Sequence, residues 1–241
     1  MAKIIMKSMN YLKPIGNNKA GKYIEICYKA MAQLIDNKYL IGSESEKDFI
    51  YERNLLISLA YFVGKNNSDK VGQCYLIGGE LNKPIFSHIF DSIEDNLEWI
   101  NYSKTKLEFT TDYVYPDFLI HRYKSLASFK SHANAGQKLI VEAKSKSISE
   151  KEFNRDFFKL NVYLSRLNFE KALYIIVNST KDEIERKIKK YSDGGLFCSQ
   201  KYENRLYFLI QENENSRPKL FKVGEELYIV ASESYSNLGA I

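Results

Sequence analysis

Two stretches of the sequence, QKLIVEAKS at residues 137–145 and VYPDFLIHR at residues 114–122, decide the fold. Each contains an apolar run that is typical of a strand inside a sheet. In the first the apolar run ends at Glu142, and in the second Asp117 directly follows Pro116. A carboxylate at the apolar centre of a sheet is costly unless a partner offsets its lost hydration. The two stretches therefore predict neighbouring strands that carry an acidic site.

The predicted site joins these two acids to a lysine. Because side chains alternate along a strand, Glu142 and Lys144 are expected on one face of it. Carboxylates from adjacent strands repel each other, which raises one pKa unless a divalent cation lies between them. Asp117 and Glu142 with an ammonium group beside them suit the metal-assisted hydrolysis of a phosphodiester. Two other interpretations stay open: Asp117 as a turn-forming acid, and Glu142 with Lys144 as a surface pair on an edge strand.

Hydrophobic periodicity outside these strands predicts a mixed α/β fold around a central sheet. Helices are predicted at residues 19–36, from a capping pair at Ser45 and Asp48 to Gly64, from Ile148 to Leu167, and from Ser179 to a point before Gly194. Further strands are predicted at residues 107–111, at 172–178 and, as an edge hairpin, in RLYFLIQE and KLFKVG. Residues 65–104 are interpreted as an insertion or accessory layer, with a strand in GQCYLIGGE and a short helix at 87–100.

The composition is that of an ordinary globular chain. Of 241 residues, 44% are hydrophobic and 27% are charged, which excludes disordered, collagen-like and coiled-coil chains. The net charge of +5 permits a polyanionic partner without requiring one. Three dispersed cysteines argue against a disulfide framework, and the N-terminus lacks a signal-peptide pattern. A soluble cytoplasmic protein is therefore expected.

Pro116-Asp117, twenty-four intervening residues and then Glu142-Ala143-Lys144 resemble the signature of the PD-(D/E)XK nuclease superfamily. The helix-strand-strand-strand-helix-strand order predicted for residues 45–178 also resembles the core shared by that superfamily. The resemblance implies a restriction-endonuclease-like fold, with a central mixed β-sheet flanked by helices. It further implies a single nuclease domain over residues 1–241, in which residues 65–104 form an insertion, 1–44 an N-terminal helical extension and 179–241 a C-terminal helix with strands.

The resemblance also implies roles for the motif residues. Asp117, Glu142 and the backbone carbonyl of Ala143 would bind Mg²⁺, with Mn²⁺ as a substitute. Lys144 would position or deprotonate the attacking water and stabilise the charge that builds on the phosphate. Cleavage would leave a 3′-hydroxyl.

Supporting residues are implied on two predicted helices. Glu52 matches an acid that some members carry on the helix before the sheet, although a solvated carboxylate explains it equally well. One branch of the family has a Gln-x-x-x-Tyr pair where this chain has Lys159 and Tyr163, so lysine replaces glutamine. A lysine and a tyrosine bordering the core are the alternative for this pair. Arg155 and Arg166 lie on the same side of this helix as candidate nucleic-acid contacts, or as a solvated face.

The function implied is a metal-dependent endonuclease acting on DNA in restriction, anti-phage defence or mobile-element processing. Two alternatives stay open: a non-catalytic nucleic-acid-binding or scaffolding module on the same fold, and a nuclease that cleaves RNA. The expected assembly is a homodimer or a complex with a partner subunit of a defence or recombination system, without a membrane partner.

Overall fold

The computed structural model describes residues 11–36, 52–67, 75–78, 83–84, 93–110, 113–122, 137–145, 148–167, 169–197, 205–213 and 215–224. A seven-stranded mixed sheet forms the centre of this part of the chain. Its strands, in order across the sheet, are β1 (Leu12–Pro14), β9 (Lys219–Val223), β8 (Leu206–Gln211), β7 (Lys171–Val177), β6 (Gln137–Lys144), β5 (Phe118–Arg122) and β2 (Tyr75–Gly78).

The sheet combines an antiparallel and a parallel half. β2, β5 and β6 form an antiparallel meander, whereas β6, β7 and β8 are parallel neighbours. β9 pairs antiparallel with β8, and β1 adds the last strand beyond β9. A mixed sheet flanked by helices confirms the predicted α/β class.

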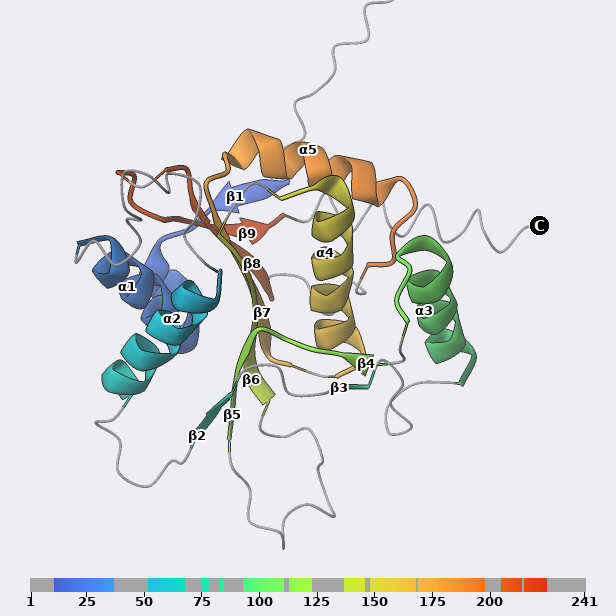
Figure 1. Ribbon diagram of the computed structural model, residues 1–241, viewed down its shortest axis with the longest axis horizontal. Helices are drawn as coiled ribbons and strands as arrows, with labels where there is room; N and C mark the ends of the chain where they lie inside the picture. The colour runs from blue at the N-terminus through green and yellow to red at the C-terminus, as the bar shows by residue number, and fades with distance from the viewer. Residues whose placement is uncertain are drawn as a thin grey trace, which may run out of the picture.

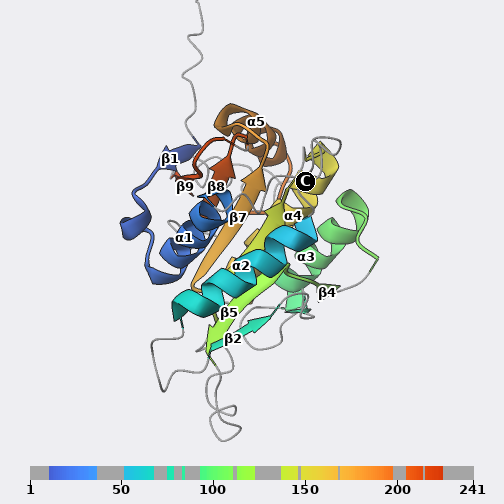
Figure 2. The same cartoon turned by 60° about the vertical axis from the view of Figure 1, so that its left-hand side comes forward.

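Helices cover both faces of this sheet (Figure 1). They are α1 (Lys22–Asp36), α2 (Glu52–Asn67), α3 (Ile93–Lys106), α4 (Glu150–Ser165) and α5 (Lys181–Ser192). A short 3₁₀ helix spans Asn17–Lys19, and β3 (Lys83–Pro84) pairs with β4 (Tyr113–Val114) in a separate small sheet. α1 and α2 lie side by side on one face, and α4 crosses the other face with α3 and α5 beside it (Figure 2). No helix in the described ranges is both long and apolar enough to cross a membrane.

α4 is the element that connects the two halves of the sheet. Parallel strands such as β6 and β7 need a crossover connection, and α4 provides it. Its start is set by a capping box, in which the Ser149 side chain accepts from the Glu152 amide and Glu152 accepts from the Ser149 amide. Helical periodicity in the sequence predicts an apolar stripe on this helix, and the structure confirms its burial; the stripe consists of Phe153, Phe157, Leu160, Leu164 and Leu167.

The near-continuous apolar run at residues 172–178 predicts a strand that is buried on both faces, and β7 confirms it. Leu173 and Ile175 face α1 and α2, whereas Tyr174 and Ile176 face α4. Because neighbouring strands flank β7 on both sides and helices cover both faces, almost every position along it is apolar.

The prediction of a strand at residues 107–111 is wrong for the described residues 107–110. α3 continues to Lys106, and a turn follows in which Glu108 has a φ of 55°. Leu107 and Phe109 produce an alternating pattern because both pack against the core under α4. The outer strand of the meander is instead β2, so residues 75–78 belong to the central sheet rather than to an accessory layer.

Several predicted boundaries also need correction. α2 continues past Gly64 to Asn67, and a side chain at Gly64 would meet open space. Its buried residues are Leu55, Leu59, Phe62 and Val63. The sequence predicts a stripe of Phe49, Leu56, Ala60 and Val63; Val63 is buried, and Leu56 and Ala60 are partly buried at the edge of the core. Ser45, Asp48 and Phe49 lie outside the described residues.

Two further corrections concern the C-terminal half. Thr180, and not Ser179, caps α5 by accepting a hydrogen bond from the Glu183 amide (3.2 Å). β8 and β9 do form a hairpin, but β1 covers β9, so β8 lies well inside the sheet.

Candidate active site

Glu142 and Lys144 lie at the end of β6, on the face that α4 covers. Their neighbour Ala143 points to the opposite face, toward α1 and α2. Glu142 is fully buried, and Lys144 is half-buried at the strand end. The alternation expected from the sequence therefore brings both side chains under one helix.

Asp117 reaches the same place from the adjacent strand. Phe118 pairs with Val141 across the antiparallel ladder, so Asp117 lies one residue before β5, beside Glu142. Asp117 Oδ2 accepts a hydrogen bond from the backbone amide of Ala143 at 2.8 Å. Its other oxygen has no hydrogen-bond donor among the described residues. The structure thus brings Asp117, Glu142 and Lys144 together.

α4 contributes a lysine and a tyrosine that both bind Glu142. Tyr163 donates its hydroxyl hydrogen bond to Glu142 Oε1 at 2.9 Å, and Lys159 forms an ion pair with Glu142 Oε2. The Lys159 side chain is only 13% exposed, so it does not extend along the surface to solvent. Lys159 and Tyr163 therefore do more than border the core, because both bind the Glu142 carboxylate.

Asp156 is a member of the site that the sequence interpretation did not assign. Asp156 Oδ1 lies 2.9 Å from Lys159 Nζ, and Oδ2 lies 3.6 Å from Lys144 Nζ. Tyr174 on β7 also donates a hydrogen bond to Asp156 Oδ2 at 3.0 Å. One signal was available, because Asp156 lies within the apolar stripe of α4, between Phe153 and Leu160. Tyr174 gave no such signal within its apolar run.

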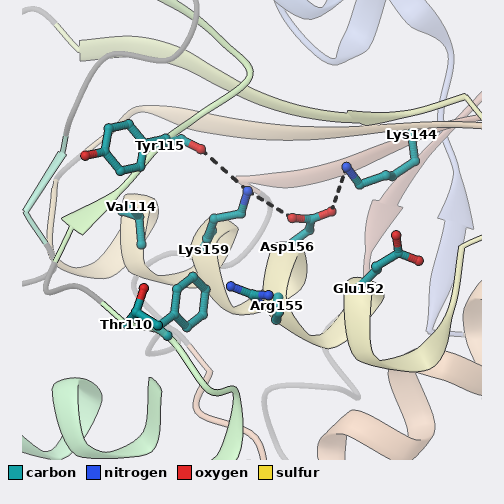
Figure 3. A pocket seen from close by; sticks show the side chains of 9 residues that line it. Thr110, Val114, Tyr115, Lys144, Glu152, Arg155, Asp156 and Lys159 are labelled. Carbon is teal, nitrogen blue, oxygen red and sulfur yellow. Dashed lines mark hydrogen bonds and ion pairs between the residues drawn. The ribbon is translucent and has the colours of Figure 1, made fainter. Parts of the chain in front are cut away.

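Lys144, Asp156 and Lys159 border a cavity of about 430 Å³, whereas Asp117 and Glu142 lie behind them and do not line it. It is lined by Phe109, Thr110, Val114, Tyr115, Lys144, Glu152, Arg155, Asp156 and Lys159. Figure 3 shows Lys159 and Lys144 converging on Asp156, with the backbone oxygen of Tyr115 on the other side of Lys159. The Tyr115 side chain is 45% exposed, so one wall of the cavity presents an accessible aromatic ring.

Burial dominates the electrostatics of the acids. Loss of hydration raises the pKa of Glu142 well above its usual range, although the Lys159 ammonium opposes this. Burial likewise raises the pKa of Asp117, against the pull of Lys159 and of the Ala143 amide. The carboxylates of Asp117, Glu142 and Asp156 thus lie close to the ammonium groups of Lys144 and Lys159.

The lysine and the tyrosines respond to the same environment. Burial alone lowers the pKa of Lys159, but the attraction of Glu142 and Asp156 outweighs it and the net pKa is raised. Burial raises the pKa of Tyr163 and Tyr174 well above the usual range, and the nearby carboxylates raise it further. Both tyrosines therefore keep their hydroxyl protons and act as hydrogen-bond donors.

The remaining predicted site residues are more distant from Glu142. The Arg155 guanidinium lies over the Phe109 ring at 4.7 Å and lines the cavity, whereas Arg166 lies over Trp99 at 5.1 Å, further along α4. Glu52 is the first residue of α2, and its side chain lies outside the described residues.

The donors fit a hard divalent cation in kind, but not in their present arrangement. Asp117 and Glu142 supply carboxylate oxygens, which Mg²⁺ prefers. No three side chains of His, Cys, Asp or Glu in the described part of the chain converge as a metal site requires. Lys159 and Tyr163 already occupy both oxygens of Glu142. A cation that binds Glu142 Oε2 therefore competes with Lys159 for that oxygen.

No protein-family model matches this chain, and searches of curated proteins and of solved structures return no significant match.

Proposed function

We propose that this chain is a metal-dependent endonuclease that hydrolyses phosphodiester bonds of DNA. One observation carries the proposal: the Asp117 carboxylate is hydrogen-bonded to the Ala143 amide, beside Glu142 and on the face that bears Lys144. The acids of two neighbouring strands and a lysine thus meet at one end of the sheet, and the lysine lines a cavity.

The order of elements supports a restriction-endonuclease-like core. α2 is followed by the antiparallel meander β2, β5 and β6, and then by α4 and the parallel strand β7. This matches the order of helix, three strands, helix and strand predicted for residues 45–178, except that β2 takes the place of the strand predicted at residues 107–111. The first strand of the core is β2, and α3 lies in the connection between β2 and β5.

The side chains have different roles in the proposed hydrolysis. Asp117 and Glu142 would hold a divalent cation, which polarises the phosphodiester and lowers the pKa of a water molecule. Lys144 faces the cavity and would stabilise the charge that builds on the phosphate. Asp156 positions Lys144 and Lys159 through ion pairs and is itself held by the Tyr174 hydroxyl.

Cleavage of supercoiled plasmid with Mg²⁺ and with EDTA tests the proposal, with RNA as a parallel substrate. Lys144→Met should lower the cleavage rate by about 10²–10³-fold, because it removes a cation aimed at the transition state. Glu142→Gln should lose cleavage at least as completely, because a metal ligand is lost. The control is Lys138→Met on the same strand, since Lys138 pairs with Glu170 at the other end of β6. Undiminished cleavage by Glu142→Gln or Lys144→Met would remove the mechanism.

One observation favours a second function, a nucleic-acid-binding module without turnover. Both oxygens of Glu142 already have protein partners, Lys159 and Tyr163, so Glu142 is neutralised without a metal. Such a module would bind DNA in EDTA with the affinity that it shows in Mg²⁺, and it would cut under no divalent cation. A gel-shift titration in both buffers separates the two functions.

A further inference from the structure

Lys159 occupies a position that resembles the centre of a cation site. Its ammonium is in contact with oxygen atoms of three residues: Glu142 Oε2, Asp156 Oδ1 at 2.9 Å and the Tyr115 backbone carbonyl at 3.5 Å. Two carboxylates and a backbone carbonyl are the oxygen ligands that hard divalent cations prefer. The lysine therefore compensates acidic charge that would otherwise stay unbalanced in a buried place.

The same ammonium borders the cavity, together with two other cationic side chains. Lys144 lies on the far side of Asp156, and Arg155 is held over the Phe109 ring. A lysine has a flexible stem with a charged end, so a small rotation of its side chain can carry the ammonium from the carboxylates into the cavity. There it would join the two cations that face an incoming phosphate.

We propose that Lys159 is an internal counter-ion that a divalent cation displaces from Glu142 into the cavity. The proposal rests on the proposed function. Without metal, Lys159 holds Glu142 and Asp156 together. With metal, the Glu142 carboxylate would bind the divalent cation in place of Lys159. The released ammonium would then position the phosphate. Metal binding and phosphate binding are thereby coupled through one side chain.

Metal affinity gives the first test, because Lys159 and the divalent cation compete for Glu142. Mn²⁺ binding is measured by isothermal titration calorimetry, without nucleic acid, for the wild type, Lys159→Met and Lys151→Met. Lys159→Met should bind Mn²⁺ about tenfold more tightly or better, the size of a typical coupling between two ligands. Lys151→Met is the matched control, since Lys151 is an exposed lysine of the same helix that pairs with Glu108; its affinity should equal that of the wild type.

A second measurement uses the wild type alone and so avoids any folding defect of a variant. The rate of lysine modification by a small amine-reactive reagent is followed residue by residue with mass spectrometry, with and without Mn²⁺. The rate at Lys159 should increase severalfold with Mn²⁺, because the ammonium leaves its buried ion pair. The rate at Lys151 should stay constant.

The outcomes separate this proposal from the proposed function. If the wild type binds Mn²⁺ while Lys159→Met binds it equally or more weakly, the displacement is overturned and the nuclease proposal stands. An unchanged labelling rate at Lys159 under saturating Mn²⁺ also overturns the displacement. If neither protein binds Mn²⁺, both proposals fall. If only Lys159→Met binds it, Lys159 is a permanent counter-ion, which overturns both displacement and metal-dependent cleavage in the natural chain.

Discussion

The two faces of β6 differ in chemistry although they belong to the same eight residues. Toward α1 and α2 the strand presents Leu139, Val141 and Ala143, which join a hydrophobic core that also contains Cys27. Toward α4 it presents Ile140 and then Glu142, whose partners are charged or hydroxyl-bearing. The apolar face stabilises the fold, whereas the buried charges on the α4 face cost some stability.

A substitution on the apolar face should have the largest effect on the free energy of unfolding and no effect on DNA cleavage. Leu173 on β7 is fully buried against α1 and α2. Leu173→Ala should lower the free energy of unfolding by about 2–5 kcal/mol, because it removes buried methyl groups and leaves a cavity. Urea denaturation measures this loss. DNA cleavage per folded molecule should be unchanged; a selective loss of cleavage in a folded variant would show that the two faces are not independent.

Removal of one hydroxyl group from the charged face should lower the free energy of unfolding by a smaller amount. Tyr163→Phe removes the hydrogen bond to Glu142, and a hydrogen bond to a charged group contributes about 1.5–3 kcal/mol. Tyr191→Phe is the control, because the Tyr191 hydroxyl donates to a neutral backbone carbonyl, that of Leu196. Its expected loss is about 0.5–1.5 kcal/mol in the same urea experiment. Equal losses in the two variants would mean that Glu142 is uncharged or held by other partners.

The smallest effect is expected from Cys27, the titratable thiol of the apolar face. Burial raises the pKa of Cys27 from 9.0 to about 12. The folded pKa is the higher one, so the thiol contributes stability below pH 9 that is lost as the pH rises toward 12. Between pH 8 and pH 10 the wild type should lose about 1.4 kcal/mol more than Cys27→Ala. Parallel urea titrations of the two proteins at both pH values measure this difference, and identical pH slopes would place Cys27 in contact with water.

Much of the architecture followed from local patterns. The α4 stripe and the continuous apolar run of β7 were predicted because burial on one side or on both sides leaves a periodic mark in the sequence. The strand predicted at residues 107–111 failed for the opposite reason. Leu107 and Phe109 alternate with polar residues, but they belong to a turn and pack under α4. A period of two over so few residues does not distinguish a strand from such a turn.

The candidate site was only partly visible before the fold was known. Asp117, Glu142 and Lys144 stood out because charges interrupt or end apolar runs. Tyr174 did not stand out, and Asp156 was not assigned although it lies within the apolar stripe of α4, because the contact between the two side chains joins α4 to β7 and no local pattern encodes it. The strand β1 was missed as well, since three residues are too few to show a period.

Hydropathy and period two are properties of neighbours in sequence, so local sequence sets which residues carry charge into apolar strands. The partners of those charges depend on the packing of distant elements. Lys159 and Glu142 are seventeen residues apart, and it is the crossover through α4 that turns the ammonium toward the strand rather than toward water. The physical reason is that ion pairs act over a few ångströms of space, whatever the separation along the chain.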